Sequence, residues 1–181
     1  MCLFKVGKKW YNAVMVHRIL EIGPDDRPRH DIGGFKLDEG QEYVAMDIRP
    51  ERFDTAEWAK LRMEYGDKVK TVMGDRANMP FESSAFDEVL MLGSHGYAKN
   101  EVKEIERVLK NGGTVKFGML AFGVQRFLAE WTPYLTHHGF NLEGKKEIQY
   151  QVHEGIGDDG KLYIPKEPLF EPYTILVFRK G

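Results

Sequence analysis

Two acidic residues each close a short apolar run of this sequence. Asp47 ends the run EYVAMD, and Asp75 ends the run KVKTVMGD. Ligands of α/β proteins bind at the carboxyl ends of the strands, where a carboxylate offers acceptors to the two hydroxyl groups of a ribose. Asp47, and less strongly Asp75, is therefore a candidate for binding a nucleoside. The alternative is that Asp47 only caps a turn, and the residue type alone does not decide between the two.

The stretch Arg18 to Gly34, RILEIGPDDRPRHDIGG, opens like a nucleotide-binding strand and turn. Such turns usually carry glycine, because a bare backbone accepts positive φ and lets the ligand come close. Asp25 and Arg27 stand in this turn instead. Aspartate tolerates left-handed backbone better than most residues, so Asp25 is compatible with the turn. The stretch lacks a G-x-G-x-x-G pattern that opens a helix, which disfavours a nicotinamide-dependent oxidoreductase.

His95 and Tyr97 lie in GSHGYA, directly after an apolar run that ends at Leu92. They are the nearest candidates for a general base, if a bound substrate has to lose a proton. The alternative is a loop histidine that hydrogen-bonds locally and a tyrosine that packs on a helix. His137 and His138 stand near the end of a predicted helix, where positive charge suits the helix dipole, and we favour that structural interpretation for both.

Short apolar runs alternate along the chain with longer segments of helical period, which is typical of an α/β domain with a mostly parallel sheet. The first five predicted strands cover residues 18–23, 42–47, 68–75, 86–92 and 113–120. Two further strands are predicted at 147–154 and 173–180. The segment between Gly23 and Tyr43 has no sustained helical period, and we expect a short helix or an irregular loop there.

Three segments have the spacing of amphipathic helices: residues 54–66, 99–113 and 123–140. Asp54 and Asn100 are the predicted N-caps, and Gly66 and Gly112 the predicted C-terminal stops. Pro133 is expected to interrupt or kink the third helix. The aromatic residues Phe122, Phe127, Trp131 and Tyr134 are interpreted as core and sheet cover rather than as a binding cage.

The composition is that of a single soluble domain of 181 residues, with a turn-rich loop inserted at residues 155–172. A net charge of -2 does not favour a nucleic-acid partner. Cys2 is the only cysteine, and the histidines are scattered, so no metal site is predicted. Neither a signal segment nor a membrane span is recognisable, and a cytoplasmic location is the expectation.

The order of these features resembles the class I S-adenosylmethionine-dependent methyltransferases. In that family a strand with acidic-x-Gly-x-Gly is followed by an acidic strand end, a GDA..LPF....FD.V block and E..RVLKPGG. The corresponding stretches here are LEIGPDD, VAMDIRPE, GDRANMPFESSAFDEVLML and EIERVLKNGGTV, within about residues 18 to 120. Four motifs in this order are far more specific than any one of them. The resemblance implies a three-layer αβα Rossmann-like fold, with a mostly parallel seven-stranded sheet whose last strand is antiparallel and lies beside the fifth.

The resemblance also implies a binding site for S-adenosylmethionine. Asp47 would bind the ribose and Asp75 the adenine amino group, while the main chain of Gly93 to His95 would face the methionine part and the substrate. The implied cofactor-binding residues are Glu21, Gly23, Asp25, Asp47, Ile48, Asp75, Arg76, Met79, Gly93 and Ser94. Asp25 would either crowd the carboxylate of the cofactor or pair with its ammonium group.

The sequence thus predicts an S-adenosylmethionine-dependent methyltransferase that acts on an unidentified small-molecule acceptor. His95 and Tyr97 are its candidate catalytic residues. The alternative is a protein of the same fold that has lost cofactor binding and acts as a structural or regulatory partner. Residues 155–172 are interpreted either as cover for the site or as a dimerisation element.

Overall fold

The computed structural model describes the main chain of residues 2–6, 9–13, 16–24, 36–92, 98–152, 155–156, 162–163 and 169–181. Side chains are described for residues 16–24, 36–92, 98–149 and 172–181. Seven strands form the main sheet: β3 (His17–Ile22), β4 (Gln41–Asp47), β5 (Val69–Met73), β6 (Phe86–Leu92), β7 (Leu109–Leu120), β8 (Phe140–Val152) and β11 (Leu169–Lys180).

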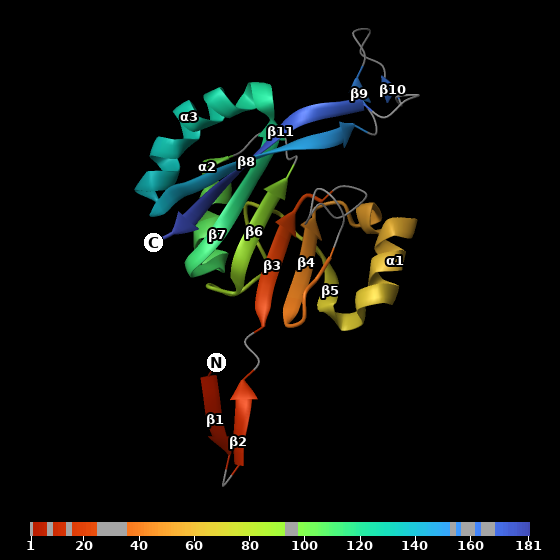
Figure 1. The fold of residues 1–181 in the computed structure, drawn as a ribbon, viewed down its shortest axis with the longest axis vertical. Coiled ribbons are helices and arrows are strands. Elements are labelled where there is room, and N and C mark those ends of the chain that lie inside the picture. The colour runs from red at the N-terminus through yellow and green to blue at the C-terminus, as the bar shows by residue number, and fades with distance from the viewer. Residues whose placement is uncertain are drawn as a thin grey trace.

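The strands follow the order β5-β4-β3-β6-β7-β11-β8 (Figure 1). Neighbouring strands from β5 to β7 are parallel, whereas β11 is antiparallel to both β7 and β8. The predicted seven-stranded sheet with an antiparallel last strand is confirmed. The register Tyr173↔Leu120 places β11 directly beside the fifth predicted strand.

The sheet separates two apolar cores. On one face Leu20 and Ile22 of β3 belong to a cluster that includes buried residues of α2 (Lys99–Val108) and α3 (Val124–His137). On the other face Ile19 packs in a cluster with Trp58 of α1 (Ala56–Tyr65). The side chains of a strand alternate between faces, so one strand serves both cores. Helices on both faces confirm the three-layer architecture.

The helix boundaries correct three sequence predictions. Thr55, not Asp54, caps α1, and its hydroxyl oxygen accepts from Trp58 N at 3.4 Å. Asp54 instead caps the C-terminal end of the preceding 3-10 helix, η1 (Pro50–Phe53). The helix α2 begins after Ala98, so Asn100 lies inside its first turn. The same helix ends at Val108 rather than near Gly112, and Lys180 Nζ binds the carbonyls of Glu106 and Leu109 at 2.7 and 2.8 Å. A side chain from the last strand thus satisfies carbonyls that the predicted glycine cap would have served.

Three of the four aromatic residues predicted as core do pack there. Phe127 is buried, and Trp131 and Tyr134 pack against the same cluster. Phe122 is 86% exposed, which makes the prediction wrong for this residue. It lies in the short turn η3 (Ala121–Gly123) between the end of β7 and α3, a turn that has no buried residue. The helix α3 runs without a break past Pro133.

Two small two-stranded sheets were not predicted. One pairs β1 (Cys2–Val6) with β2 (Lys9–Ala13), and the other pairs β9 (Gly155–Ile156) with β10 (Leu162–Tyr163). The pairing of β8 with β11 also continues past the end of β7, since Leu169 is opposite Val152. Figure 1 shows this extension running beyond the carboxyl ends of the parallel strands. The central part of the segment after Gly23, residues 25–35, lies outside the described residues.

Candidate functional site

The carboxyl ends of three strands are joined to one another by main-chain hydrogen bonds. Gly23 N donates to Met46 O at 2.8 Å, and Gly74 N donates to Asp47 O at 3.0 Å. The glycine after β3, the aspartate that ends β4 and the turn after β5 are therefore neighbours at one edge of the sheet. This juxtaposition brings Gly23, Asp47 and Asp75 into one region, as ligand binding at the carboxyl edge of a parallel sheet requires.

Within the described part of the chain, only one of the two carboxylate oxygens of Asp47 has a hydrogen-bond donor. Its side chain is only 6% exposed, and Oδ1 accepts from Arg49 N at 2.8 Å, with Arg49 Nε at 3.7 Å. Among the described residues, no group donates to Oδ2. Ile48, the next residue, is 65% exposed despite its apolar side chain. A pre-oriented acceptor beside an exposed apolar surface suits a ribose with an attached base.

Gly23 provides open space next to this acceptor. Its φ of 65° lies in the left-handed region, where glycine carries no steric penalty. A Cβ added at Gly23 would have no atom of a described residue within 4 Å. With respect to the described part of the chain, the backbone at Gly23 therefore leaves room for a ligand. Asp25 itself lies outside the described residues.

A compact turn follows β5. Asp75 Oδ1 accepts from Ala77 N at 2.8 Å, and Asn78 N donates to Asp75 O at 3.0 Å. Gly74 packs so closely beneath this turn that an added Cβ would lie 2.7 Å from Met46 Sδ. Met79 is 3% exposed and belongs to the core on the α2 side. Asp75 is therefore exposed at the surface, whereas the buried side chain of Met79 holds the end of the turn against the core.

The helix α2 fixes the chain that follows this turn. Glu104 Oε2 accepts from Met79 N at 2.8 Å, and Arg107 donates to Met79 O at 3.0 Å and to Phe81 O at 2.6 Å. Arg107 also bonds Glu104, and this hydrogen bond holds the pKa of the Glu104 carboxyl below its usual value although burial opposes the change. The Glu104–Arg107 pair therefore positions residues 79–81.

Sequence reasoning assigned no role to Glu104 or Arg107. Both belong to the stretch EIERVLKNGGTV, which was used only as a motif. A glutamate and an arginine three residues apart lie on one face of a helix, and that spacing is the signal that could have indicated a pair. Tyr43 was missed as well, because it stands inside an apolar run; its hydroxyl donates to Glu21, and both side chains are fully buried.

Arg76 contacts the start of α2. Its Nε lies 2.7 Å from Glu101 Oε1, and the side chain of Glu101 is 6% exposed. The other oxygen, Oε2, accepts from Ala98 N at 3.0 Å. Gly93, Ser94, His95 and Tyr97 lie outside the described residues, between the end of β6 and Ala98. The carboxylate of Glu101 is thus shared between the turn at Asp75 and the end of that segment.

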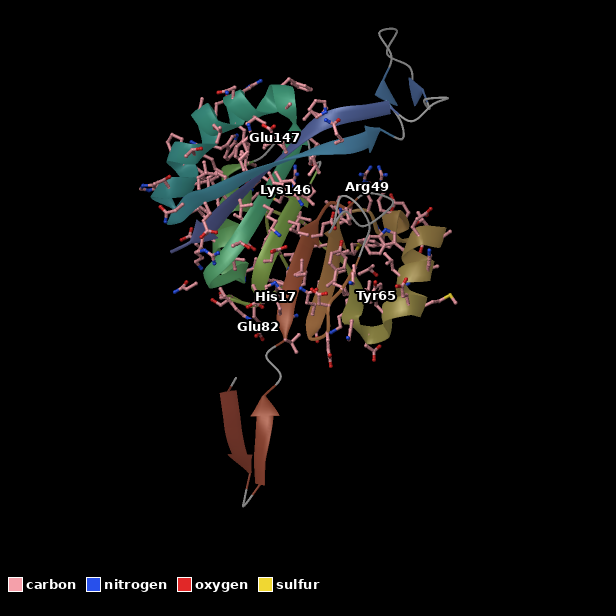
Figure 2. The ribbon with its side chains drawn as sticks, viewed as in Figure 1. His17, Arg49, Tyr65, Glu82, Lys146 and Glu147 are labelled. Carbon is pink, nitrogen blue, oxygen red and sulfur yellow. The ribbon has the colours of Figure 1, made fainter. Side chains whose placement is uncertain are left out.

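An open hollow of about 460 Å³ lies at the opposite end of the sheet. It is lined by His17, Asp87, Lys110 and Arg179 among others. Its charges are neutralised in pairs, such as Lys110 with Asp87 at 2.8 Å. Figure 2 shows His17 at one end of the sheet and Arg49 at the other. Because it is remote from the carboxyl edge and its charges are paired, we do not assign it as the functional site.

Metal binding and membrane insertion have no support in the described residues. Those residues contain no group of three or more His, Cys, Asp or Glu side chains that could hold a metal ion. Within the same part of the chain, the helices are too short or too polar to cross a bilayer.

Comparison with known proteins agrees with this geometry. Residues 34–117 match the family described as "Methyltransferase domain". The chain is 29% identical to probable phthiotriol/phenolphthiotriol dimycocerosates methyltransferase 2 of Mycobacterium ulcerans, over 63% of this chain and 43% of that protein. It is 36% identical to sterol 4-C-methyltransferase strm-1 of Caenorhabditis elegans, over 45% of this chain and 26% of that protein. The chain thus spans less than half the length of these curated relatives.

A solved structure extends the likeness to the fold. The 1,6-didemethyltoxoflavin-N1-methyltransferase of Burkholderia thailandensis, solved with 1,6-didemethyltoxoflavin and S-adenosylhomocysteine, superposes with a TM-score of 0.61. The match covers 92% of this chain and 72% of that chain at 16% identity. At this level of identity the comparison establishes a common fold and does not by itself establish a common function.

Proposed function

We propose that the chain is a class I S-adenosylmethionine-dependent methyltransferase and that it transfers a methyl group from S-adenosylmethionine to a small-molecule acceptor. The observation that carries the proposal is the Asp47 carboxylate. It is nearly buried and held by Arg49 N, and Oδ2 has no donor among the described residues. A ribose supplies the two hydroxyl donors that such an oxygen lacks.

The residues at the carboxyl edge fit the cofactor. Asp47 would hold the ribose hydroxyls, the exposed side chain of Ile48 would pack on the adenine, and Asp75 would accept from the adenine amino group. The open backbone at Gly23 would lie along the methionine part. When bound, S-adenosylmethionine supplies a methyl group that is already electrophilic because it is attached to a sulfonium.

The chain's own contribution to the chemistry is orientation. Holding an acceptor in line with the methyl group accounts for much of the rate in such a reaction, since no strong nucleophile has to be generated by the protein. If the acceptor has to lose a proton, His95 and Tyr97 are the proposed proton acceptors, on the sequence evidence alone. Cytoplasmic location and a homodimeric state are further proposals from the sequence.

We propose further that the acceptor is largely apolar. The two curated relatives are named for phthiotriol dimycocerosates and for a sterol, which are apolar compounds. Phe122 is 86% exposed in the turn after β7, at the same edge as Asp47.

The change Phe122→Ser should weaken binding of a fluorescent sterol, whereas Met63→Ser, at an 87% exposed residue of α1, should not. If both variants bind the sterol equally well, Phe122 does not contribute to acceptor binding.

Calorimetric titration of the purified protein tests the proposed function. S-adenosylmethionine and S-adenosylhomocysteine should each bind at one site, whereas NAD should give no heat of binding. If neither cofactor form binds at about millimolar concentration, which corresponds to about 4 kcal/mol of binding free energy, the proposal fails. A protein of this fold without cofactor binding would then be the better interpretation.

A further inference from the structure

Four neighbouring strands contribute one residue each to a row at the carboxyl edge of the sheet. The register aligns, across β6, β7, β11 and β8, the residues Leu92, Gly118, Ile175 and Lys146. Residues that stand opposite each other on neighbouring strands lie on the same face of a sheet. Leu92 and Ile175 pack with the core that contains Trp58 of α1. The row therefore lies on the face that carries α1, and Leu92, the last residue of β6, places it at the carboxyl edge.

A second row lies two residues further along these strands. Leu120, Tyr173 and Ile148 stand side by side on β7, β11 and β8. Leu120 and Ile148 are partly buried, whereas Tyr173 is only 4% exposed and its ring lies over Gly118. A Cβ added at Gly118 would lie 2.7 Å from Tyr173 Cε1, so glycine leaves the room that this ring needs. The two rows thus form an apolar floor at the carboxyl edge.

Lys146 is the charged member of the first row. It is exposed, and it forms no ion pair within the described part of the chain. Two other cations on the same face, on β7 and β11, are paired. Lys116 lies 2.9 Å from Glu88, and Arg179 donates to Glu143 at 2.9 Å. The ammonium group of Lys146 is therefore available to an anion from outside the described residues.

Lys145, the preceding residue, provides a comparison. The register sets Lys145 opposite Leu176, which belongs to the core on the side of α2 and α3. Lys145 therefore lies on the opposite face of β8, where it pairs with Glu147 at 2.6 Å. Both lysines are exposed and carry the same charge, but only Lys146 borders the apolar floor.

The proposed cofactor occupies the other half of the carboxyl edge. Gly23, Asp47 and Asp75 stand at the ends of β3, β4 and β5, and the strand order continues from β3 to β6, β7, β11 and β8. A cofactor bound at the first three strands leaves the second half of the edge to the acceptor. Leu92 and Lys146 are three strands apart, which corresponds to about 14 Å at the usual strand spacing. An acceptor of this length would reach from the strand beside the cofactor to the Lys146 ammonium.

We propose that these two rows form an acceptor surface, and that the methyl acceptor is an amphipathic compound with an apolar body and one anionic group that pairs with Lys146. This inference rests on the proposed function and adds a chemical class of acceptor to it. The apolar body would cover Leu120, Ile148 and Ile175, which are partly buried. A carboxylate or sulfate at its end would meet an ammonium beside an apolar surface, where water screens the attraction less than in bulk.

Two fluorescent probes test the charged end of the acceptor surface. Anilinonaphthalene sulfonate has an apolar ring system and a sulfonate, and phenylnaphthylamine has the same rings without the sulfonate. In the full chain, Lys146→Gln should raise the Kd of the sulfonate probe about two- to fivefold, as expected for loss of a surface ion pair. The Kd of the neutral probe should not change. Lys146→Arg and the matched control Lys145→Gln should bind both probes like the wild type.

The same probes test the apolar floor. Ile148→Ser should raise the Kd of both probes about three- to tenfold, because it removes apolar surface from beneath the rings. Leu142→Ser is the control and should leave both Kd values unchanged, since Leu142 is a 45% exposed residue of β8 opposite Phe178, on the other face. Circular dichroism checks the fold of each variant. Because Lys146 is exposed, the lysine variants decide the proposal even if Ile148→Ser does not fold.

A third arm of the experiment adds saturating S-adenosylhomocysteine. The Kd of the sulfonate probe for the wild type should then change by less than about twofold, because the cofactor and the acceptor would occupy different halves of the edge.

The outcomes separate this inference from the proposed function. If calorimetry shows that the wild type does not bind S-adenosylhomocysteine, the proposed function fails, and the assignment of this surface to a methyl acceptor fails with it. If the wild type binds S-adenosylhomocysteine but Lys146→Gln binds the sulfonate probe like the wild type, the acceptor surface is wrong while the proposed function stands. Displacement of the probe by S-adenosylhomocysteine, an equal loss in Lys145→Gln, or no binding of either probe at about millimolar concentration would overturn the acceptor surface in the same way.

Discussion

Tyr43 donates its phenolic hydrogen to the carboxylate of Glu21 on the neighbouring parallel strand, and both side chains are fully buried. Burial, together with the charge and hydrogen bond of Glu21, raises the pKa of Tyr43 well above its usual value. The ring of Tyr43 also stacks on Trp58 of α1, with centroids 6.3 Å apart. Because Gly23 follows two residues after Glu21, this contact links the packing of α1 to the start of the proposed cofactor turn.

The change Tyr43→Phe should lower the free energy of unfolding by about 1–3 kcal/mol, because it removes a fully buried hydrogen bond to the Glu21 carboxylate. Urea denaturation at neutral pH measures this difference. The control is Tyr134→Phe, which removes a hydroxyl that donates to Lys99 O at an exposed position and should cost less than about 1 kcal/mol. Equal stability of Tyr43→Phe and the wild type would contradict the structural role of the contact.

The Tyr43–Glu21 hydrogen bond should also make the free energy of unfolding depend on pH in the alkaline range. A tyrosine with a raised pKa in the folded state stabilises the protein fully below its unfolded value of 10.0, and that stabilisation is lost as the pH rises through the folded value. The stability advantage of the wild type over Tyr43→Phe should therefore shrink above about pH 10. Unfolding measurements on both proteins between neutral and alkaline pH test this. An advantage that stays constant would exclude Tyr43 as the titrating group.

Asp47→Ala should weaken binding of S-adenosylhomocysteine by roughly ten- to a hundredfold, or about 1.5–3 kcal/mol, because it removes a charged acceptor for two hydroxyls. Calorimetry on the folded variant gives the change in Kd. Asp67→Ala, at an exposed residue of η2 (Gly66–Lys68), serves as control and should bind like the wild type. Unchanged affinity in Asp47→Ala would place the ribose elsewhere.

Arg107→Met should destabilise the fold by about 2–3 kcal/mol, since the arginine donates to two main-chain carbonyls and to Glu104. The lowered pKa of Glu104 also makes the free energy of unfolding depend on pH in the acidic range. The Glu104–Arg107 pair stabilises the fold above pH 4.5, the pKa of Glu104 in the unfolded chain, and this stabilisation is lost as the pH falls through the lower pKa of the folded state. The stability difference between wild type and variant should therefore narrow below about pH 4.5. A difference that widens in acid would contradict this assignment.

Asp25→Gly tests the departure of the turn from the family pattern. We expect the variant to bind S-adenosylmethionine more tightly, by about two- to tenfold, because the change removes side-chain bulk and a negative charge near the cofactor carboxylate. Calorimetry gives the sign directly. Weaker binding would instead mean that Asp25 pairs with the ammonium group of the cofactor.

The strands were predictable because each is a short apolar run that ends at a turn residue. The run FDEVLML matches β6 at both ends, and EYVAMD lacks only the first residue of β4. The helix ends were less predictable, because tertiary contacts override local caps. Asn100 would be a good N-cap in isolation, but Glu101 already holds the Ala98 amide, and the helix begins one residue before Asn100.

The contacts that organise the site could not be read from the sequence. Tyr43 and Glu21 lie 22 residues apart, and Arg107 and Phe81 lie 26 apart, so local spacing gives no sign of either pair. They meet because β3 and β4 are parallel neighbours and because side chains of α2 contact the main chain of residues 79–81. The position of Asp47 at a strand end was predictable, since it follows from the polarity pattern alone. The hydrogen bond from Arg49 N that orients the Asp47 carboxylate was not predictable.

A crystal structure of the protein with S-adenosylhomocysteine tests the central claim most directly. The account predicts that both ribose hydroxyls lie within hydrogen-bond distance of the Asp47 carboxylate, and that the adenine lies beside Ile48 and the turn that begins at Asp75. A ligand bound in the hollow lined by Asp87 and Arg179, or a ribose that does not contact Asp47, would contradict it.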